Sequence, residues 1–131
     1  MSSPPSSPSP RDRVDDLANR LETEREAFEP PDDSEAADAC AKRYCREGIG
    51  PTILVYVEGR AGDELVAFDQ ETFDRLECTL NGWLKLYARC YDVETNPNVT
   101  VREAAEVFVD THSARHTAQI LTGVPQRSSN V

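Results

Sequence analysis

Four cysteines and two histidines are the residues of this chain best suited to bind a metal. His112 and His116 are four residues apart, and on a continuous helix they would face the same way, as zinc ligands do. Cys40 and Cys45 would complete the set, with spacings C-x4-C and H-x3-H. Sixty-six residues separate the two halves, and no C-x2-C knuckle is present. A zinc-stabilised domain with these four ligands is therefore kept as an alternative.

The cysteines could also pair with one another across helices. On their predicted helices, Cys40 and Cys45 point about 140° apart and Cys78 and Cys90 about 120° apart. Neither pair can bridge within its own helix, but a member of one pair could meet a member of the other. Because no secretion signal opens the sequence, a disulfide framework is not expected, and the four cysteines are interpreted as small core residues.

No pattern in the sequence assembles a catalytic site. GxGxxG, P-loop, GxSxG and HExxH motifs are all absent, and no serine, cysteine or threonine stands near an obvious base. The many carboxylates have no apolar surroundings that would separate their pKa values for acid and base roles. We expect a protein that is not an enzyme and binds no cofactor.

Residues 100–123 have the rhythm of a helix–turn–helix. Thr100 and Glu103 form a capping box that predicts a helix start, and Ser113 predicts the start of a second short helix. A DNA-binding regulator is thus a second alternative. Its groove-facing residues would be Arg115, His116, Thr117 and Gln119. The turn lacks a glycine and is longer than usual, so a plain helical hairpin is the competing interpretation.

The elements expected to position these residues make an α+β fold. Residues 52–58, TILVYVE, are β-branched and aromatic and lie between Pro51 and Gly59, which predicts a strand. Residues 63–68 predict its return partner in a β-hairpin. Over 73–91, apolar residues recur at three-four spacing. The hairpin should pack on this long amphipathic helix, with three or four shorter helices around it.

One domain with appendages is expected. The divisions are a disordered Ser/Pro leader at 1–10, an accessory helix and linker at 11–34, the α+β domain at 35–125 and a disordered tail at 126–131. Within the domain, a helix over 35–47 should end at Gly48. The helix over 11–28 has a thin apolar stripe, so it must dock on the rest of the chain, on a second copy or on a partner.

The charge balance indicates a salt-rich cytoplasm. The 131 residues carry a formal charge of -10, with twelve arginines but only two lysines, Lys42 and Lys85. Molar salt would screen the self-repulsion of such a chain. The acidity argues against nonspecific binding to nucleic acids or acidic membranes in ordinary salt. No apolar stretch approaches the roughly 18 residues of a membrane helix.

A family resemblance also indicates a protein of a salt-rich cytoplasm. The runs LVYVEGRAGDELVAFD, LNGWLKLYARCYDVE and VTVREAAEVFVDTHSARHTAQILTGVP, between about residues 50 and 125, resemble small acidic haloarchaeal proteins of unknown function. The resemblance implies a cytoplasmic protein and no functional residues. We predict a small non-catalytic interaction or regulatory protein of a halophilic cell. Its partner would be an unknown protein or a second copy, bound through the 11–28 helix or a free hairpin edge.

Overall fold

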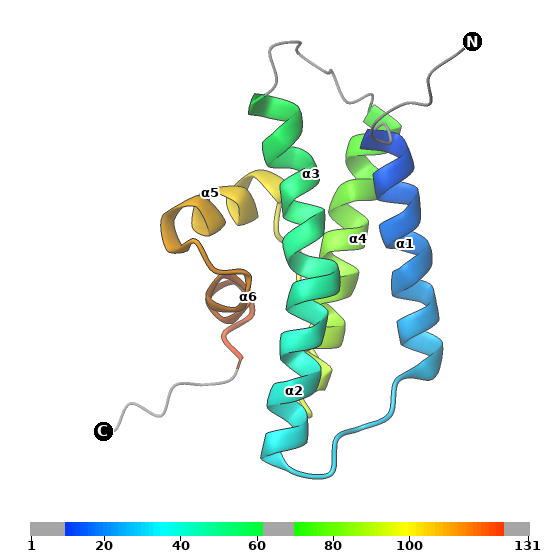
Figure 1. Cartoon of the computed structure of the whole chain (residues 1–131), viewed down its shortest axis with the longest axis vertical. Helices are drawn as coiled ribbons and strands as arrows, with labels where there is room; N and C mark the ends of the chain where they lie inside the picture. The colour runs from blue at the N-terminus through cyan, green and yellow to red at the C-terminus, as the bar shows by residue number, and fades with distance from the viewer. Residues whose placement is uncertain (1–9, 62–69, 125–131) are drawn as a thin grey trace, which may run out of the picture.

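The computed structural model describes residues 10–61 and 70–124, and every regular element within them is helical (Figure 1). The elements are α1 (Pro10–Ala27), α2 (Ser34–Tyr44), the π-helical turn η1 (Cys45–Ile49), α3 (Gly50–Ala61), α4 (Gln70–Arg89), α5 (Val101–Thr111) and α6 (Ala114–Thr122). The predicted α+β class is wrong, because the described residues contain no strand.

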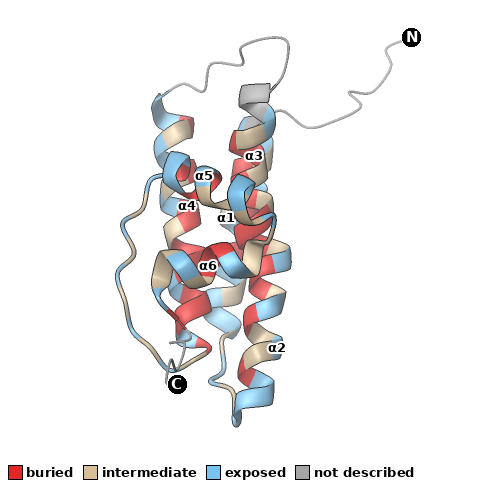
Figure 2. Ribbon diagram, turned by 90° about the vertical axis from the view of Figure 1, so that its left-hand side faces the viewer, coloured by how far each residue is buried: buried red, intermediate tan, exposed pale blue. Residues whose placement is uncertain are grey.

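Three long helical segments stand side by side: α1, the uninterrupted run α2–η1–α3, and α4 (Figure 1). The short helices α5 and α6 lie across one side of this group, where α5 packs against α3 and α6 against η1. Figure 2 shows buried residues toward the middle and exposed residues on the outer surfaces. The largest fully buried side chains are Trp83, Tyr44 and Tyr87.

The predicted strand over 52–58 is the middle of α3. Proline was expected to break the chain before it, but a π-helical turn carries the helix past Pro51. The Gly50 N–H donates to the carbonyl of Cys45, five residues back rather than four. The helix predicted over 35–47 therefore does not end at Gly48 and continues to Ala61. The predicted return strand, 63–68, lies outside the described residues.

Burial explains why β-branched residues form a helix here. Ile53, Val55 and Tyr56 are buried, and α3 packs against both α1 and α5. An apolar run without a polar side has no alternation to distinguish a covered strand from a covered helix. Strand propensity is also a weak preference that packing overrides.

The local start and stop signals of the two C-terminal helices were read correctly. The capping box at Thr100 and Glu103 is formed, since the Glu103 N–H donates to the Thr100 hydroxyl and the Thr100 N–H to the Glu103 carboxylate. The Ser113 hydroxyl accepts from the His116 N–H at 3.1 Å and starts α6. Gly123 ends α6 with a φ of 72°. The long amphipathic helix is confirmed as α4.

Of the three docking surfaces considered for the N-terminal helix, the rest of the chain is the one that α1 covers. Val14, Leu17 and Leu21 are buried against it. Gly82 of α4 permits this approach, because a Cβ at that position would lie 2.4 Å from Leu21 Cδ2. Gly82 thus marks a close approach between α4 and α1. In the described ranges, no helix has the length and apolar character to cross a membrane.

Candidate functional site

A groove of about 680 Å³ lies between α4, the C-terminal end of α1 and the connection that leads from α4 to α5. One stripe of α4 forms its floor, with Asp74, Glu77, Asn81 and Lys85 at helical spacing. The opposite wall is made by residues 96–98 of the connection. Figure 2 shows this connection running back along α4 toward α5. The groove is therefore elongated, open and lined mainly by polar side chains.

The connection is extended for local reasons. Asp92 has a left-handed backbone with a φ of 62°, and the Val93 N–H donates to the Ala88 carbonyl, which ends α4 in a Schellman-type cap. Pro97 then disfavours a helical conformation at Asn96. From 91 to 100, half-buried and exposed residues alternate strictly, as they do in a strand.

The backbone of residues 94–98 is free on this surface. Among the residues that the structure describes, none provides a hydrogen-bond partner for its N–H or carbonyl groups. Most backbone groups of folded proteins are paired, and those of an unpaired extended segment resemble the edge of a sheet. The rim of the groove thus offers hydrogen-bonding groups to another chain.

Asn81 holds this rim in place. Its Nδ2 donates to the Val99 carbonyl at 3.0 Å, and its Oδ1 accepts from the Val99 N–H at 3.0 Å. One helical turn earlier on α4, Glu77 Oε2 accepts a hydrogen bond from the Val101 N–H at 3.1 Å. Two side chains of α4 therefore fasten the end of the connection where α5 begins.

The groove has oppositely charged ends. Arg25, Lys85 and Arg89 meet around a smaller adjoining hollow of about 120 Å³. Arg25 is paired with Glu22 at 2.8 Å and Arg89 lies over the Phe28 ring, but Lys85 has no ion pair with any described residue. Two carboxylates of α4 line the groove away from this cationic end.

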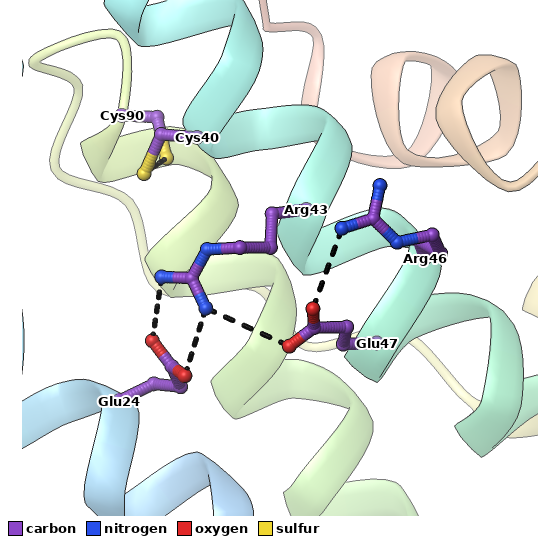
Figure 3. Close-up of polar contacts among 6 residues, drawn as sticks. All are labelled: Glu24, Cys40, Arg43, Arg46, Glu47 and Cys90. Atoms are coloured by element: carbon purple, nitrogen blue, oxygen red, sulfur yellow. Dashed lines mark hydrogen bonds and ion pairs between the residues drawn. The ribbon is translucent and has the colours of Figure 1, made fainter.

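A second cluster lies between α1, α2 and α4 (Figure 3). Cys40 Sγ of α2 and Cys90 Sγ, just beyond α4, are 2.8 Å apart, and both cysteines are free thiols. Cys40 is half-buried and Cys90 is 3% exposed. Burial, and then the contact with Cys40, raises the pKa of the Cys90 thiol well above its usual range.

Arg43 is one helical turn beyond Cys40 and links α2 to α1. Its guanidinium makes a two-pronged pair with Glu24, at 2.8 and 2.9 Å, and lies 3.6 Å from Glu47 Oε1, which in turn contacts Arg46 (Figure 3). The hydrogen bonds from Arg43 lower the pKa of the Glu24 carboxyl below its usual value of about 4.5.

The ion pair between Glu24 and Arg43 should make the free energy of unfolding depend on pH. A carboxyl whose pKa is depressed by folding stabilises the folded state above its unfolded-state pKa, and loses that contribution as the pH falls through the folded-state value. Glu24→Gln should therefore lower the free energy of unfolding at neutral pH, and its deficit should shrink below pH 4.5. Urea unfolding at several pH values measures this. The exposed Glu26→Gln is the matched control, and a deficit that stays constant with pH would contradict the expectation.

Comparison with known proteins identifies the family of this chain. A family model described as a domain of unknown function, DUF8055, matches residues 8–126. The chain belongs to the DUF8055 family. The matched range contains every helix described above, α1 included. No curated protein and no solved structure matches the chain. The predicted membership of a family of unknown function is thus confirmed, while its haloarchaeal origin stays a prediction.

In this DUF8055 protein, the proposed zinc ligands do not come together. Cys40 contacts Cys90, and Cys45 is buried in the core, where burial raises the pKa of its thiol to about 12. His112 and His116 are exposed on α5's end and on α6. Within 10–61 and 70–124, no three His, Cys, Asp or Glu side chains are grouped as a metal site.

The residues proposed to face DNA are divided between the surface and the interior. Thr117 is fully buried, and its hydroxyl donates to the Ser113 carbonyl at 2.7 Å. Arg115 pairs with Asp38 of α2 at 3.3 Å. His116 is exposed and Gln119 half-buried. The helical pair exists as predicted, but these contacts favour the plain helical hairpin, and DNA binding stays an untested prediction.

Proposed function

We propose that this DUF8055 protein is a non-catalytic interaction protein that binds an extended segment of a partner protein in the groove beside α4. The free backbone of residues 94–98 carries this proposal. An extended peptide can add to such an edge by main-chain hydrogen bonds, while pockets beside it read alternate side chains. The exposed amides of Asn96 and Asn98 add further donors and acceptors along the same rim.

The charges of the groove select the partner's chemistry. Lys85 has no counterion among the described residues and is joined by Arg25 and Arg89, so the bound segment should place an acidic residue at that end. In a chain of net charge -10, this basic cluster is a local exception that would orient an acidic segment. We also propose a salt-rich cytoplasm as its setting, because the acidic surface and the scarcity of lysine suit molar salt.

An interaction role fits the groove better than catalysis does. The described side chains that line it include one thiol, that of Cys78, and no histidine. A nucleophile needs a base within hydrogen-bond reach. The carboxylates there are engaged, since Asp74 accepts from Gln70 at 2.8 Å and Glu77 from Val101. Holding the rim, rather than transferring protons, is the role these contacts support.

Selection from a display library of short, unstructured peptides against the whole chain tests the proposal. We expect acidic peptides, and at least about tenfold weaker binding when Lys85→Glu reverses the groove's charge, since 1.4 kcal/mol is a factor of ten. Lys42→Glu changes the net charge identically at an exposed position of α2 and should leave binding unchanged. The measurements should be made in dilute buffer and in molar KCl.

Hydrogen exchange locates the bound peptide. Amides at residues 94, 95, 96 and 98 should become protected in the complex, because no residue in 10–61 or 70–124 accepts a hydrogen bond from them in the free protein. If the selected peptides bind both lysine variants equally and leave these amides unprotected, the groove is not the binding site.

A further inference from the structure

We propose that Cys40 and Cys90 form a redox modification site, at which a hydroperoxide oxidises Cys40 and Cys90 closes a disulfide between α2 and the end of α4. The inference does not rest on the groove, which lies on another face of α4 and contains neither residue. It rests on the placement of two thiols that are 50 residues apart in the chain and 2.8 Å apart in space.

The two Sγ atoms are close enough that a disulfide would require only a small movement. A disulfide holds its sulfur atoms about 2.05 Å apart. The two Sγ atoms already point toward each other from neighbouring helical segments, as Figure 3 shows. The other two cysteines have no such neighbour: the structure describes no sulfur contact for Cys45 or Cys78.

The two thiols differ in their access to solvent. Cys40 is half-buried, so a small oxidant can reach it, whereas Cys90 is 3% exposed and shielded behind it. The thiolate is the form that reacts, and burial disfavours the thiolate of Cys90 by raising its pKa. Cys40 is thus the thiol oxidised first, and Cys90 the thiol that then forms the disulfide with it.

The chemistry is a balanced two-electron oxidation. The Cys40 thiolate attacks one peroxide oxygen; the O–O bond breaks, and the other oxygen leaves as an alcohol or water after taking a proton. The sulfur of Cys40 is now a sulfenic acid. Cys90 Sγ then attacks that sulfur, the S–S bond forms, and the hydroxyl leaves as water with the Cys90 proton. Both electrons end on the peroxide.

The bond would tie α2 covalently to the end of α4 and enclose η1, α3 and all of α4 in a loop. A cross-link over a loop of 50 residues restricts the unfolded chain strongly, so the melting temperature should rise by on the order of 10 °C. The oxidised form would therefore be a more rigid bundle, returned to the dithiol state by a thiol reductant.

Titration of the full chain with hydrogen peroxide tests the site. After thiol blocking, non-reducing peptide mapping should find an intramolecular Cys40–Cys90 link, with the molecule lighter by two hydrogen atoms and reversible by dithiothreitol. Cys90→Ser should stop the reaction at a sulfenic acid on Cys40, which dimedone traps. Cys40→Ser should leave Cys90 reduced, and Cys40→Ala should give the same result. Circular dichroism checks that both variants remain helical.

Cys78 is the internal comparison, because it is exposed and unpaired on α4. Cys78→Ser should leave the link and its melting shift unchanged. If peroxide oxidises Cys78 while Cys40 and Cys90 stay as thiols, or if Cys90→Ser accumulates no sulfenic acid on Cys40, the proposal is overturned.

Discussion

Gly48→Ala should destabilise the bundle by roughly 3 kcal/mol, the upper part of the range for overpacked cores. A Cβ at position 48 would lie 2.1 to 2.5 Å from Cδ2, Cε3 and Cε2 of Trp83. The indole cannot move aside easily, because Trp83 has no exposed surface and packs against Tyr44. Helix propensity alone predicts the opposite sign, a gain of about 1 kcal/mol for alanine over glycine.

Urea unfolding of the variant measures this effect, and Gly82→Ala is its matched control. At position 82 the new Cβ meets the end of the Leu21 side chain at 2.4 Å, and that end can rotate. Its cost should therefore stay within about 1 kcal/mol. Trp83→Phe removes part of the ring, so Gly48→Ala should cost less in that background. A stabilising Gly48→Ala would mean that the π-helical turn does not pack on Trp83 as described.

Asn81→Ala should destabilise the protein by about 2 kcal/mol and loosen the rim of the groove. The change leaves the N–H and the carbonyl of Val99 without partners, where each now has a hydrogen bond of 3.0 Å to one side chain. Because the effect is local, exchange of the Val99 amide should accelerate far more than exchange in the middle of α4. Peptide binding in the groove should weaken in parallel.

Hydrogen exchange followed by mass spectrometry, together with urea unfolding, checks this expectation. Asn81→Asp keeps the acceptor for the Val99 N–H but loses the donor to its carbonyl, so it should fall between the wild type and alanine. The exposed Asn19→Ala on α1 should change neither quantity. Unchanged exchange at Val99 in Asn81→Ala would show that other contacts hold the connection.

The ends of the C-terminal helices could be predicted because their causes are local. Thr100 with Glu103, Ser113 and Gly123 each satisfy backbone groups within three or four residues, so the sequence carries the whole signal. The prediction at Pro51 was wrong because the structure there depends on packing and not on local signals. Its local meaning is a break, and only the π-helical turn and the burial of α3 between α1 and α5 make it part of a helix.

The candidate sites divide in the same way. The angles between cysteines on their helices excluded a link within each pair and left open a meeting across helices, which the contact between Cys40 and Cys90 provides. Which two would meet depended on the packing of α2 on α4. The groove had only a faint signal, the Asn81-Gly82 pair inside a helix, because its wall depends on contacts with Val99, 18 residues away.

Trp83 gives the molecule an optical reporter of its own. It is the chain's only tryptophan, it is fully buried, and its ring centroid is 5.9 Å from that of Tyr44. Excitation absorbed by this tyrosine should pass to the indole only while α2 and α4 remain packed. Emission from one residue, without any label, should thus shift to longer wavelength when water reaches the junction of η1 and α4.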